Sequence, residues 1–345
     1  MSTFTLGLGI LGGVVLAGVV GWNAWTTRKL TPRQAEAPTP RDDAHADTGP
    51  VEPSFDGPLG DDSVPPLPQP ERKPGLDALI DAIAPIAVDT LVSGEAALAA
   101  LPATRRAGSK PFAIEGHDER TQHWETPQAG RRYNAFQAGV QLANRMGALN
   151  EIEYSEFVVK AQAFADAIGG SPEFPEMLEE VARARELDQF AGGHDAQLGF
   201  TLRARSAAWS PGYVQQNAAK LGFIAGAIPG RMVLPASQQG QPPLLVLSFD
   251  TQAALAEDPT QAAIRDITLS LDVPQVHRGE QPFLRMREAA VALATSMDGV
   301  LTDDAGQLIR DEGLDVIGAD LEQLYDTLEA RDLAAGSPQA RRLFS

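Results

Sequence analysis

The sequence predicts an α+β protein whose folded part consists of two similar units, each an antiparallel β-sheet covered by helices on one face, as in split β-α-β folds. Three observations support this fold class. A long uncharged apolar stretch opens the chain, and a Pro-rich acidic stretch follows it. The order strand, helix, three strands and two helices is then found twice, as the spacing of apolar residues indicates. We therefore expect a transmembrane anchor at 1–27, a disordered linker at 28–75, an α+β unit at 76–192, a second one at 193–335 and a flexible tail at 336–345.

The first segment is predicted to be a single transmembrane helix. No charged residue occurs from Thr3 to Trp25, and a bilayer core needs about 20 apolar residues in helical form. Basic residues follow this stretch at Arg28 and Lys29, whereas none precedes it, so the positive-inside rule places everything after the span in the cytoplasm. A cleavable signal peptide is the competing interpretation, but the segment before the apolar stretch is uncharged and the stretch itself is too long.

Self-association through the transmembrane helix is a second interpretation of the same segment. Gly9 and Gly13 form a small-xxx-small pair, which can bring two helices together in a membrane. Such a pair also arises by chance in a span this rich in Gly. We expect residues 4–25 to contact the membrane in either case.

The linker and the overall charge restrict the classes of partner. Eleven of the 45 residues at 31–75 are Pro and nine are acidic, a composition that cannot bury enough apolar surface to fold. The whole chain has 46 acidic against 28 basic residues, so its surface repels phosphate backbones and nucleic acid is not an expected partner. Cys is absent, which excludes disulfides and thiolate metal sites.

The first unit shows strand and helix signals in alternation. Ile86 and Val88 lie in a predicted strand, and Ser93 is expected to cap the short helix after it. Asn150 and Glu153 have the spacing of a capping box at the start of a longer helix. Further strands are expected at 110–115, 121–126 and 136–142, and helices along 157–168 and 177–187.

The second unit repeats this order with clearer alternation. Phe200 and Leu202 alternate with polar residues, as in a strand with one buried face. Ser210 and Pro211 have the sequence pattern of a helix start. The remaining strands are expected at 231–236, 244–250 and 267–273, with helices at 283–297 and 317–328.

Three stretches of the second unit carry a family resemblance. They are Lys220 to Gly226 after the first helix, Ile267 to Pro274 in the late strand, and Ala294 to Asp304, where a helix ends at Gly and an apolar pair precedes Asp-Asp. In order and spacing they resemble the C-terminal FtsZ-binding domain of the ZipA cell-division family, over roughly 195–330. The anchor and the Pro-rich linker match the plan of that family. Residues 76–192 have no recognised counterpart in it.

The resemblance implies a non-enzymatic scaffold at the bacterial inner membrane, single-pass, with a periplasmic N-terminus and cytoplasmic C-terminal units. Its partner would be the C-terminal tail of FtsZ, bound in a shallow groove on the open face of the sheet, and the chain would thereby tether the division ring for septum assembly. Arg203, Arg205 and Ser270 make this face more polar than the family's groove. Carried over by position, the groove comprises Thr201, Arg203, Arg205, Met232, Leu234, Leu247, Phe249, Thr268 and Ser270.

Other residue clusters point to ordinary structure rather than chemistry. His117, Asp118 and His123 are of metal-ligand type, but they straddle a predicted turn, which favours such residues in any case. Trp124 and Trp209 are expected in the core or as staples, with a role as exposed anchors for a partner as the alternative. No nucleophile elbow, P-loop or dinucleotide-binding fingerprint occurs, so we expect no catalytic residues, no metal and no cofactor.

One alternative class stays open at this point. The same N-terminal segment in the opposite topology would export an envelope enzyme or a glycan-binding module. The sequence also leaves open which of the two units holds the partner, what residues 76–192 do, and whether Arg341 to Phe344 form a docking peptide or a frayed tail; we expect the tail.

Overall fold

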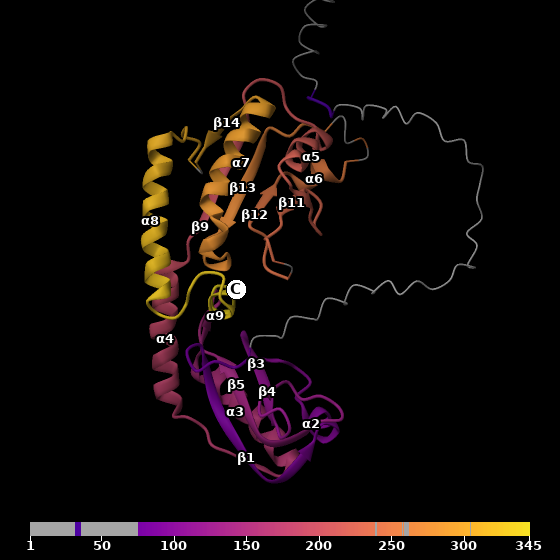
Figure 1. Ribbon diagram of the computed structural model, residues 1–345, viewed down its shortest axis with the longest axis vertical. Coiled ribbons are helices and arrows are strands. Elements are labelled where there is room, and N and C mark those ends of the chain that lie inside the picture. The colour runs from indigo at the N-terminus through magenta and orange to yellow at the C-terminus, as the bar shows by residue number, and fades with distance from the viewer. Residues whose placement is uncertain (1–31, 36–74, 239, 257, 259–261, 304) are drawn as a thin grey trace, which may run out of the picture.

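The computed structural model describes residues 32–35 and 75–345, except 239, 257, 259–261 and 304. The expected transmembrane anchor and nearly all of the expected linker lie outside these residues. Among the residues that are described, no helix is both long and apolar enough to cross a membrane. The described chain forms two β-sheets that follow each other along the long axis of the molecule (Figure 1).

The first sheet is antiparallel and is built from residues 81–172. Short strand β4 (Trp124–Glu125) pairs with the far end of β3 and extends the sheet beside β2. The order of the other strands is β2 (Arg106–Ala107), β3 (Lys110–Asp118), β5 (Arg132–Gln141), β1 (Asp81–Ser93) and β8 (Gly170–Pro172). A two-stranded hairpin of β6 (Ala143–Asn144) and β7 (Gly147–Ala148) follows β5.

Helices cover one face of this sheet, as predicted. Ser93 caps α2 (Gly94–Ala100), because its side chain accepts a hydrogen bond from the Ala96 amide. The predicted capping box of Asn150 and Glu153 is present at the start of α3 (Glu151–Ile168). Phe164 of α3 packs edge-on against Phe136 of β5 with ring centroids 5.3 Å apart, so α3 forms the core with the sheet. Helix α4 (Met177–His194) leads to the second unit.

The second sheet is also antiparallel and uses residues 197–302. Its strand order is β10 (Ile224–Ala225), β11 (Arg231–Leu234), β12 (Leu245–Ser248), β13 (Asp266–Asp272), β9 (Gln197–Ala204) and β14 (Gly299–Thr302). Ser210 caps α5 (Pro211–Lys220) as its pattern predicts. The other helical elements are α6 (Thr251–Ala254), the 3-10 turns Val273–Gln275 and Arg278–Glu280, α7 (Pro282–Met297) and α8 (Asp311–Glu329).

Helix α7 covers one face of the second sheet. Its buried residues Met286, Leu293 and Met297 belong to the same core as Leu269 of β13, and Phe283 packs against Phe200 of β9 with ring centroids 6.4 Å apart. Helix α8 adds an outer layer against α7, where Phe283 approaches Gly318. The opposite face of the sheet has no helix in the described chain running across its central strands (Figure 1).

The two sheets share one topology, in line with the predicted repeat. The spatial order β3, β5, β1, β8 in the first sheet matches β12, β13, β9, β14 in the second. In both sheets the third of these four strands comes first in the chain, followed by the first, the second and the fourth. The edge strands β8 and β14 were not predicted. They are three and four residues long, and each begins directly after the residue that caps the preceding helix. Their hydrophobic alternation is therefore too short to be recognised.

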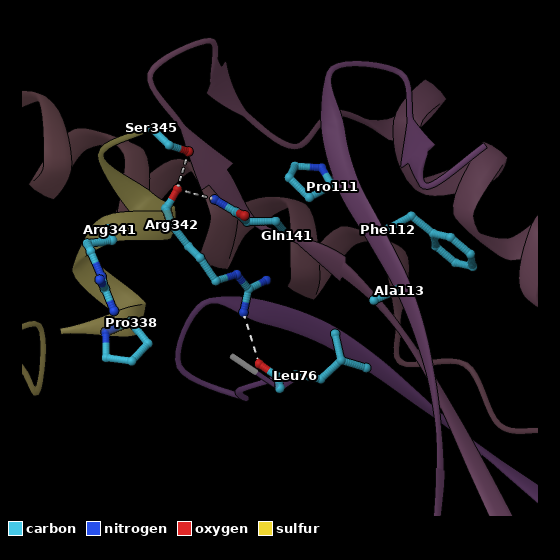
Figure 2. A pocket seen from close by; sticks show the side chains of 10 residues that line it. Leu76, Pro111, Phe112, Ala113, Gln141, Pro338, Arg341, Arg342 and Ser345 are labelled. Atoms are coloured by element: carbon cyan, nitrogen blue, oxygen red, sulfur yellow. Dashed lines mark hydrogen bonds between the residues drawn. The ribbon is translucent and has the colours of Figure 1, made fainter. Parts of the chain in front are cut away.

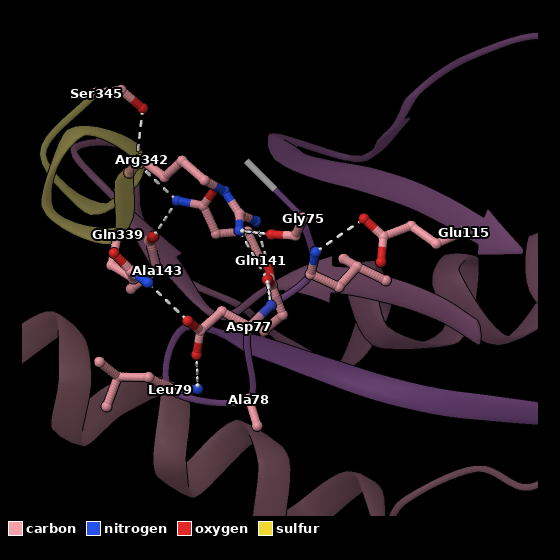
Figure 3. Close-up of polar contacts among 12 residues, drawn as sticks. Gly75, Asp77, Ala78, Leu79, Glu115, Gln141, Ala143, Gln339, Arg342 and Ser345 are labelled. Atoms are coloured by element: carbon pink, nitrogen blue, oxygen red, sulfur yellow. Dashed lines mark hydrogen bonds and ion pairs between the residues drawn. The ribbon is translucent and has the colours of Figure 1, made fainter. Parts of the chain in front are cut away.

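The C-terminal residues form a helix at the junction of the two units, so the expectation of a flexible tail at 336–345 is wrong. Helix α9 (Pro338–Leu343) lies between the two sheets (Figure 1), and Phe344 is 1% exposed. The Arg342 guanidinium donates to the fully buried Asp81 carboxylate of β1, with Nη1 2.8 Å from Oδ2. Figure 3 shows Arg342 and the hydrogen bond that its carbonyl accepts from the Gln141 side-chain amide, which is 2.8 Å long.

Contacts to the second unit complete the junction. The Gln275 side chain donates to the Phe344 carbonyl over 2.7 Å. Arg145, which follows β6, pairs with Asp195 at 2.6 Å and with Asp272 of β13 at 2.7 Å. Hydrogen bonds to Asp195 and then to Asp272 raise the pKa of Arg145. Because both acids precede or end strands of the second unit, this guanidinium ties the β6–β7 hairpin to it.

A short part of the expected linker also packs against the second unit. Arg33 forms a parallel β-bridge with Trp209, and its amide donates to the Ala208 carbonyl over 2.7 Å. Its side chain reaches Asp298 after α7, with Nη2 2.8 Å from Oδ2. The prediction of a disordered spacer is therefore wrong for residues 32–35, where an arginine and a backbone bridge supply contacts that composition does not reveal.

Candidate functional site

The uncovered face of the second sheet is defined by the register of its strands. Residues that are paired across neighbouring strands lie on the same face. Thr201 pairs with Thr268 and with Thr302, and Thr268 pairs with Ser248, so these four hydroxyl residues form one row. We call this surface, which the helices leave uncovered, the open face. It comprises Gln197, Gly199, Thr201, Arg203, Ile224, Arg231, Val233, Val246, Ser248, Asp266, Thr268, Ser270, Asp272, Val300 and Thr302.

The structure places four of the nine predicted groove residues on this face. They are Thr201, Arg203, Thr268 and Ser270, all from the two central strands β9 and β13. Most of the open face is half-buried, because neighbouring strands shield one another, whereas Arg203 and Arg231 are exposed. Arg205 lies just beyond β9 and points its exposed guanidinium toward Asp298, 4.0 Å away.

The other four predicted groove residues lie on the opposite, helix-covered face. Met232 and Leu247 pair with each other, and Leu247 pairs with the core residue Leu269. Met232, Leu247 and Phe249 are buried, with exposed fractions of 5%, 0% and 8%, and Leu234 is half-buried on the same side. The prediction that these four line the groove is wrong, because the register was displaced by one residue in both strands.

The cause of this error can be read in the two short strands. β11 has the sequence Arg-Met-Val-Leu and β12 has Leu-Val-Leu-Ser. Apolar residues therefore point to both faces of the sheet, and hydrophobic alternation does not decide which face is buried. The polar residue at one end of each strand indicates the exposed face instead. Arg231 at the start of β11 pairs with Ser248 at the end of β12, and the face that carries these two polar residues is the one exposed to solvent. Val233 and Val246 are therefore the apolar residues that β11 and β12 contribute to the open face.

The polar groups of the open face are held in place by local contacts. Arg203 Nε lies 2.8 Å from Asp266 Oδ1, with side chains about half exposed, a class of ion pair that contributes about 0–1 kcal/mol to folding. Ser270 Oγ donates to the Val246 carbonyl over 3.3 Å, and Thr302 Oγ1 donates to the Thr201 carbonyl over 3.3 Å. The face thus offers valine methyl groups, small hydroxyls and two guanidinium groups, which suits a peptide with apolar and acidic side chains.

Groups for covalent or metal chemistry are not gathered on this face. Within the described ranges, no cluster of three or more His, Asp or Glu side chains has the geometry to hold a metal ion. His117 and Asp118 end strand β3 of the first unit, and a turn follows them. The Asp118 carboxylate accepts from the Arg120 and Thr121 amides, and these backbone hydrogen bonds lower the pKa of Asp118, with the one from Thr121 as the largest cause.

The two tryptophans that the sequence singled out have different roles. Trp209 is fully buried, and its indole donates to the Met297 carbonyl over 2.8 Å, so the predicted core role is confirmed. Trp124 is 44% exposed and packs edge-on against His117, with ring centroids 5.1 Å apart. It lies at the edge of the first sheet and outside the core, so of the two predicted roles, core or staple, only that of a staple at a strand edge agrees with its position.

A comparison with known families assigns the second unit. Residues 240–319 match the family described as ZipA, C-terminal FtsZ-binding domain. Residues 240–319 of the second unit are thus similar to a ZipA C-terminal domain. The match spans β12, β13, α7, β14 and the first half of α8, which include the valine and hydroxyl positions Val246, Ser248, Thr268, Ser270 and Val300 of the open face. No curated protein matches the chain.

The match bears out the resemblance noted in the sequence. The matching family is described as FtsZ-binding. The helix-covered side of this domain forms its core, and the open face is its largest strand surface without a helix over it in the described chain.

Proposed function

We propose that this chain is a membrane-anchored cell-division scaffold that binds the C-terminal tail of FtsZ on the open face of its second sheet. The match of residues 240–319 to the FtsZ-binding domain carries this proposal. Two of the open-face strands, β12 and β13, lie wholly inside the match and supply Val246 and Thr268 at the centre of the face. Val233 and Val246 bury apolar side chains of the tail, and Arg203 and Arg231 pair with its acidic groups.

Titration of a labelled FtsZ tail peptide tests the binding face. Thr268→Lys places a long charged side chain in the middle of the hydroxyl row and should weaken tail binding about tenfold or more. Gln323→Lys on the exposed side of α8 adds the same charge away from the sheet and should leave binding unchanged. Equal binding by both variants would mean that the tail binds elsewhere on the chain.

The tethering part of the proposal rests on residues 4–25, which are uncharged and apolar. Deletion of residues 1–27 should release the protein from membranes, because the remaining chain keeps its two sheets and their junction. If the truncated chain still sediments with membranes after a high-salt wash, another membrane contact exists. A reporter at the C-terminus should be active only in the cytoplasm, whereas activity in the periplasm would favour the exported alternative.

A further inference from the structure

A groove runs along the outer edge of β3 in the first unit, outside the family match. It consists of two hollows of about 500 and 350 Å³ that share Phe112 and Ala113 as lining residues. Figure 2 shows the larger one, between β3 and the C-terminal helix α9. The smaller one lies between β3 and the loop that follows α2. We call the two together the β3-edge groove.

The strand edge inside this groove has no neighbouring strand. β2 pairs with β3 at Lys110 and Pro111, and β4 pairs with it at Gly116 and His117. In the part of the chain that is described, no strand covers the edge between these two pairings. The Phe112 amide donates outward to the Arg105 carbonyl, so the backbone groups of Ile114, two residues on, point to the same side. An extended peptide can add there as a further strand.

The charge of the groove is opposite to that of the whole chain. Its lining includes Arg105, Arg341 and Arg342 but no Asp or Glu, although the chain has 46 acidic and 28 basic residues. Arg342 is neutralised by Asp81. Arg341 donates only to the uncharged Gln241 side chain, and Arg105 has no ion pair within the described residues. Within the described residues, each hollow therefore holds one guanidinium without an ion pair.

The nearest carboxylate does not cancel these charges. Glu115 lies two residues beyond Ala113 on the same face of the sheet, but its side chain is only 7% exposed. Its oxygens accept hydrogen bonds from the Leu76 amide and the Gln137 side chain, 3.1 and 2.8 Å long. A ligand in the groove would meet arginines and apolar groups rather than this acid.

The rest of the lining is mainly apolar. Leu98 of α2 is 41% exposed and Ala113 is also exposed, while Leu76 and Leu101 are half-buried. Such side chains accept an apolar anchor, and guanidinium groups bind carboxylates with well-defined geometry. We propose that the β3-edge groove binds an extended segment of a partner protein, in which acidic residues flank an apolar centre and the backbone pairs with the edge of β3.

A fluorescent peptide tests this proposal with the full-length chain. The probe carries two aspartates on each side of a Val-Leu-Val centre. It should bind saturably and more weakly at higher salt. Arg105→Glu should weaken binding about tenfold or more, whereas Arg185→Glu, the same change on the exposed side of α4, should not. A probe with lysines in place of the aspartates should not bind.

Several outcomes would overturn the proposal. They are the absence of saturable binding up to about 1 mM peptide, equal binding of the lysine probe, and full binding by Arg105→Glu. If the probe bound only after deletion of residues 36–70, the occupant would be the chain's own acidic linker and the partner proposal would be wrong. Binding of the FtsZ tail should be unaffected by Arg105→Glu, which separates a failure here from a failure of the proposed function.

Discussion

The two sheets of this protein share one strand order, yet their uncovered faces differ in chemistry. In the first sheet, Pro85, Ala87 and Ala113 expose small apolar side chains on the face opposite α3. In the second, Thr201 and Thr268 form part of a hydroxyl row with arginines at its margin. The repeated topology therefore fixes where a face lies, and the residues at alternate strand positions decide what it can bind.

The largest effects should come from the two cores, and they test whether the units are energetically separate. Phe136→Ala in the first core and Leu271→Ala in the second remove side chains that are 0% and 1% exposed. We expect losses of about 3–5 and 2–5 kcal/mol in the free energy of unfolding. Urea denaturation measures both, followed by the fluorescence of single-tryptophan variants that keep Trp124 for the first unit or Trp209 for the second. Ser270→Ala on the open face should change little, and a loss equal to that of Leu271→Ala would contradict the strand register.

The next largest effect should come from the junction between the units. Arg342→Ala leaves the Asp81 carboxylate, whose side chain is fully buried, without its guanidinium. Removal of one partner of a buried pair costs about 3 kcal/mol or more. In the same denaturation experiment, this variant should separate the transitions of the two units. Arg185→Ala on the exposed side of α4 is the control. A single unshifted transition in Arg342→Ala would show that α9 does not couple the sheets.

Two buried tyrosines offer a smaller and more direct comparison of the units. Tyr154 in α3 donates to the Pro175 carbonyl, whereas the Tyr325 hydroxyl in α8 has no hydrogen-bond partner among the described residues. Tyr154→Phe should therefore destabilise the protein by about 1 kcal/mol, and Tyr325→Phe should be neutral or stabilising by a similar amount. Thermal unfolding at neutral pH measures both, and the opposite ranking would contradict this account.

The pH dependence of the same residues follows from their burial. Burial raises the pKa of Tyr154 and of Tyr325 to about 12 in the folded protein, above the ordinary value of 10. Their contribution to stability is complete below pH 10 and is lost as the pH rises through 12. Each Phe variant should lose less stability than the parent protein over this alkaline range, as denaturant titrations at several pH values would show.

The smallest effect concerns the exposed arginine of the open face. Arg203 and its partner Asp266 are about half exposed, so Arg203→Ala should change the free energy of FtsZ tail binding by only about 0–1 kcal/mol. The change should disappear at high salt, because exposed charges are screened. Peptide titrations at two salt concentrations measure it. A large salt-independent loss would mean that Arg203 is buried against the tail.

Much of the fold could be predicted because local signals agreed with tertiary structure. The caps at Ser93, Asn150 and Ser210 and the alternation in β9 and β13 were correct, since each depends on residues close in sequence. Phe249 and the other apolar residues of β11 and β12 were assigned to the wrong face. In strands of four residues with apolar side chains on both faces, the sequence does not reveal which face is buried. The role of the C-terminal residues was missed because their partners, such as Asp81, lie more than 250 positions away.

The position of α9 has a practical consequence for how this protein can be labelled. Phe344 is buried and the Ser345 carbonyl accepts a hydrogen bond from the Arg145 amide, so any fused domain would leave directly from the junction of the two sheets. A fluorescent protein or affinity tag joined there without a spacer would compete with the contacts that align the units.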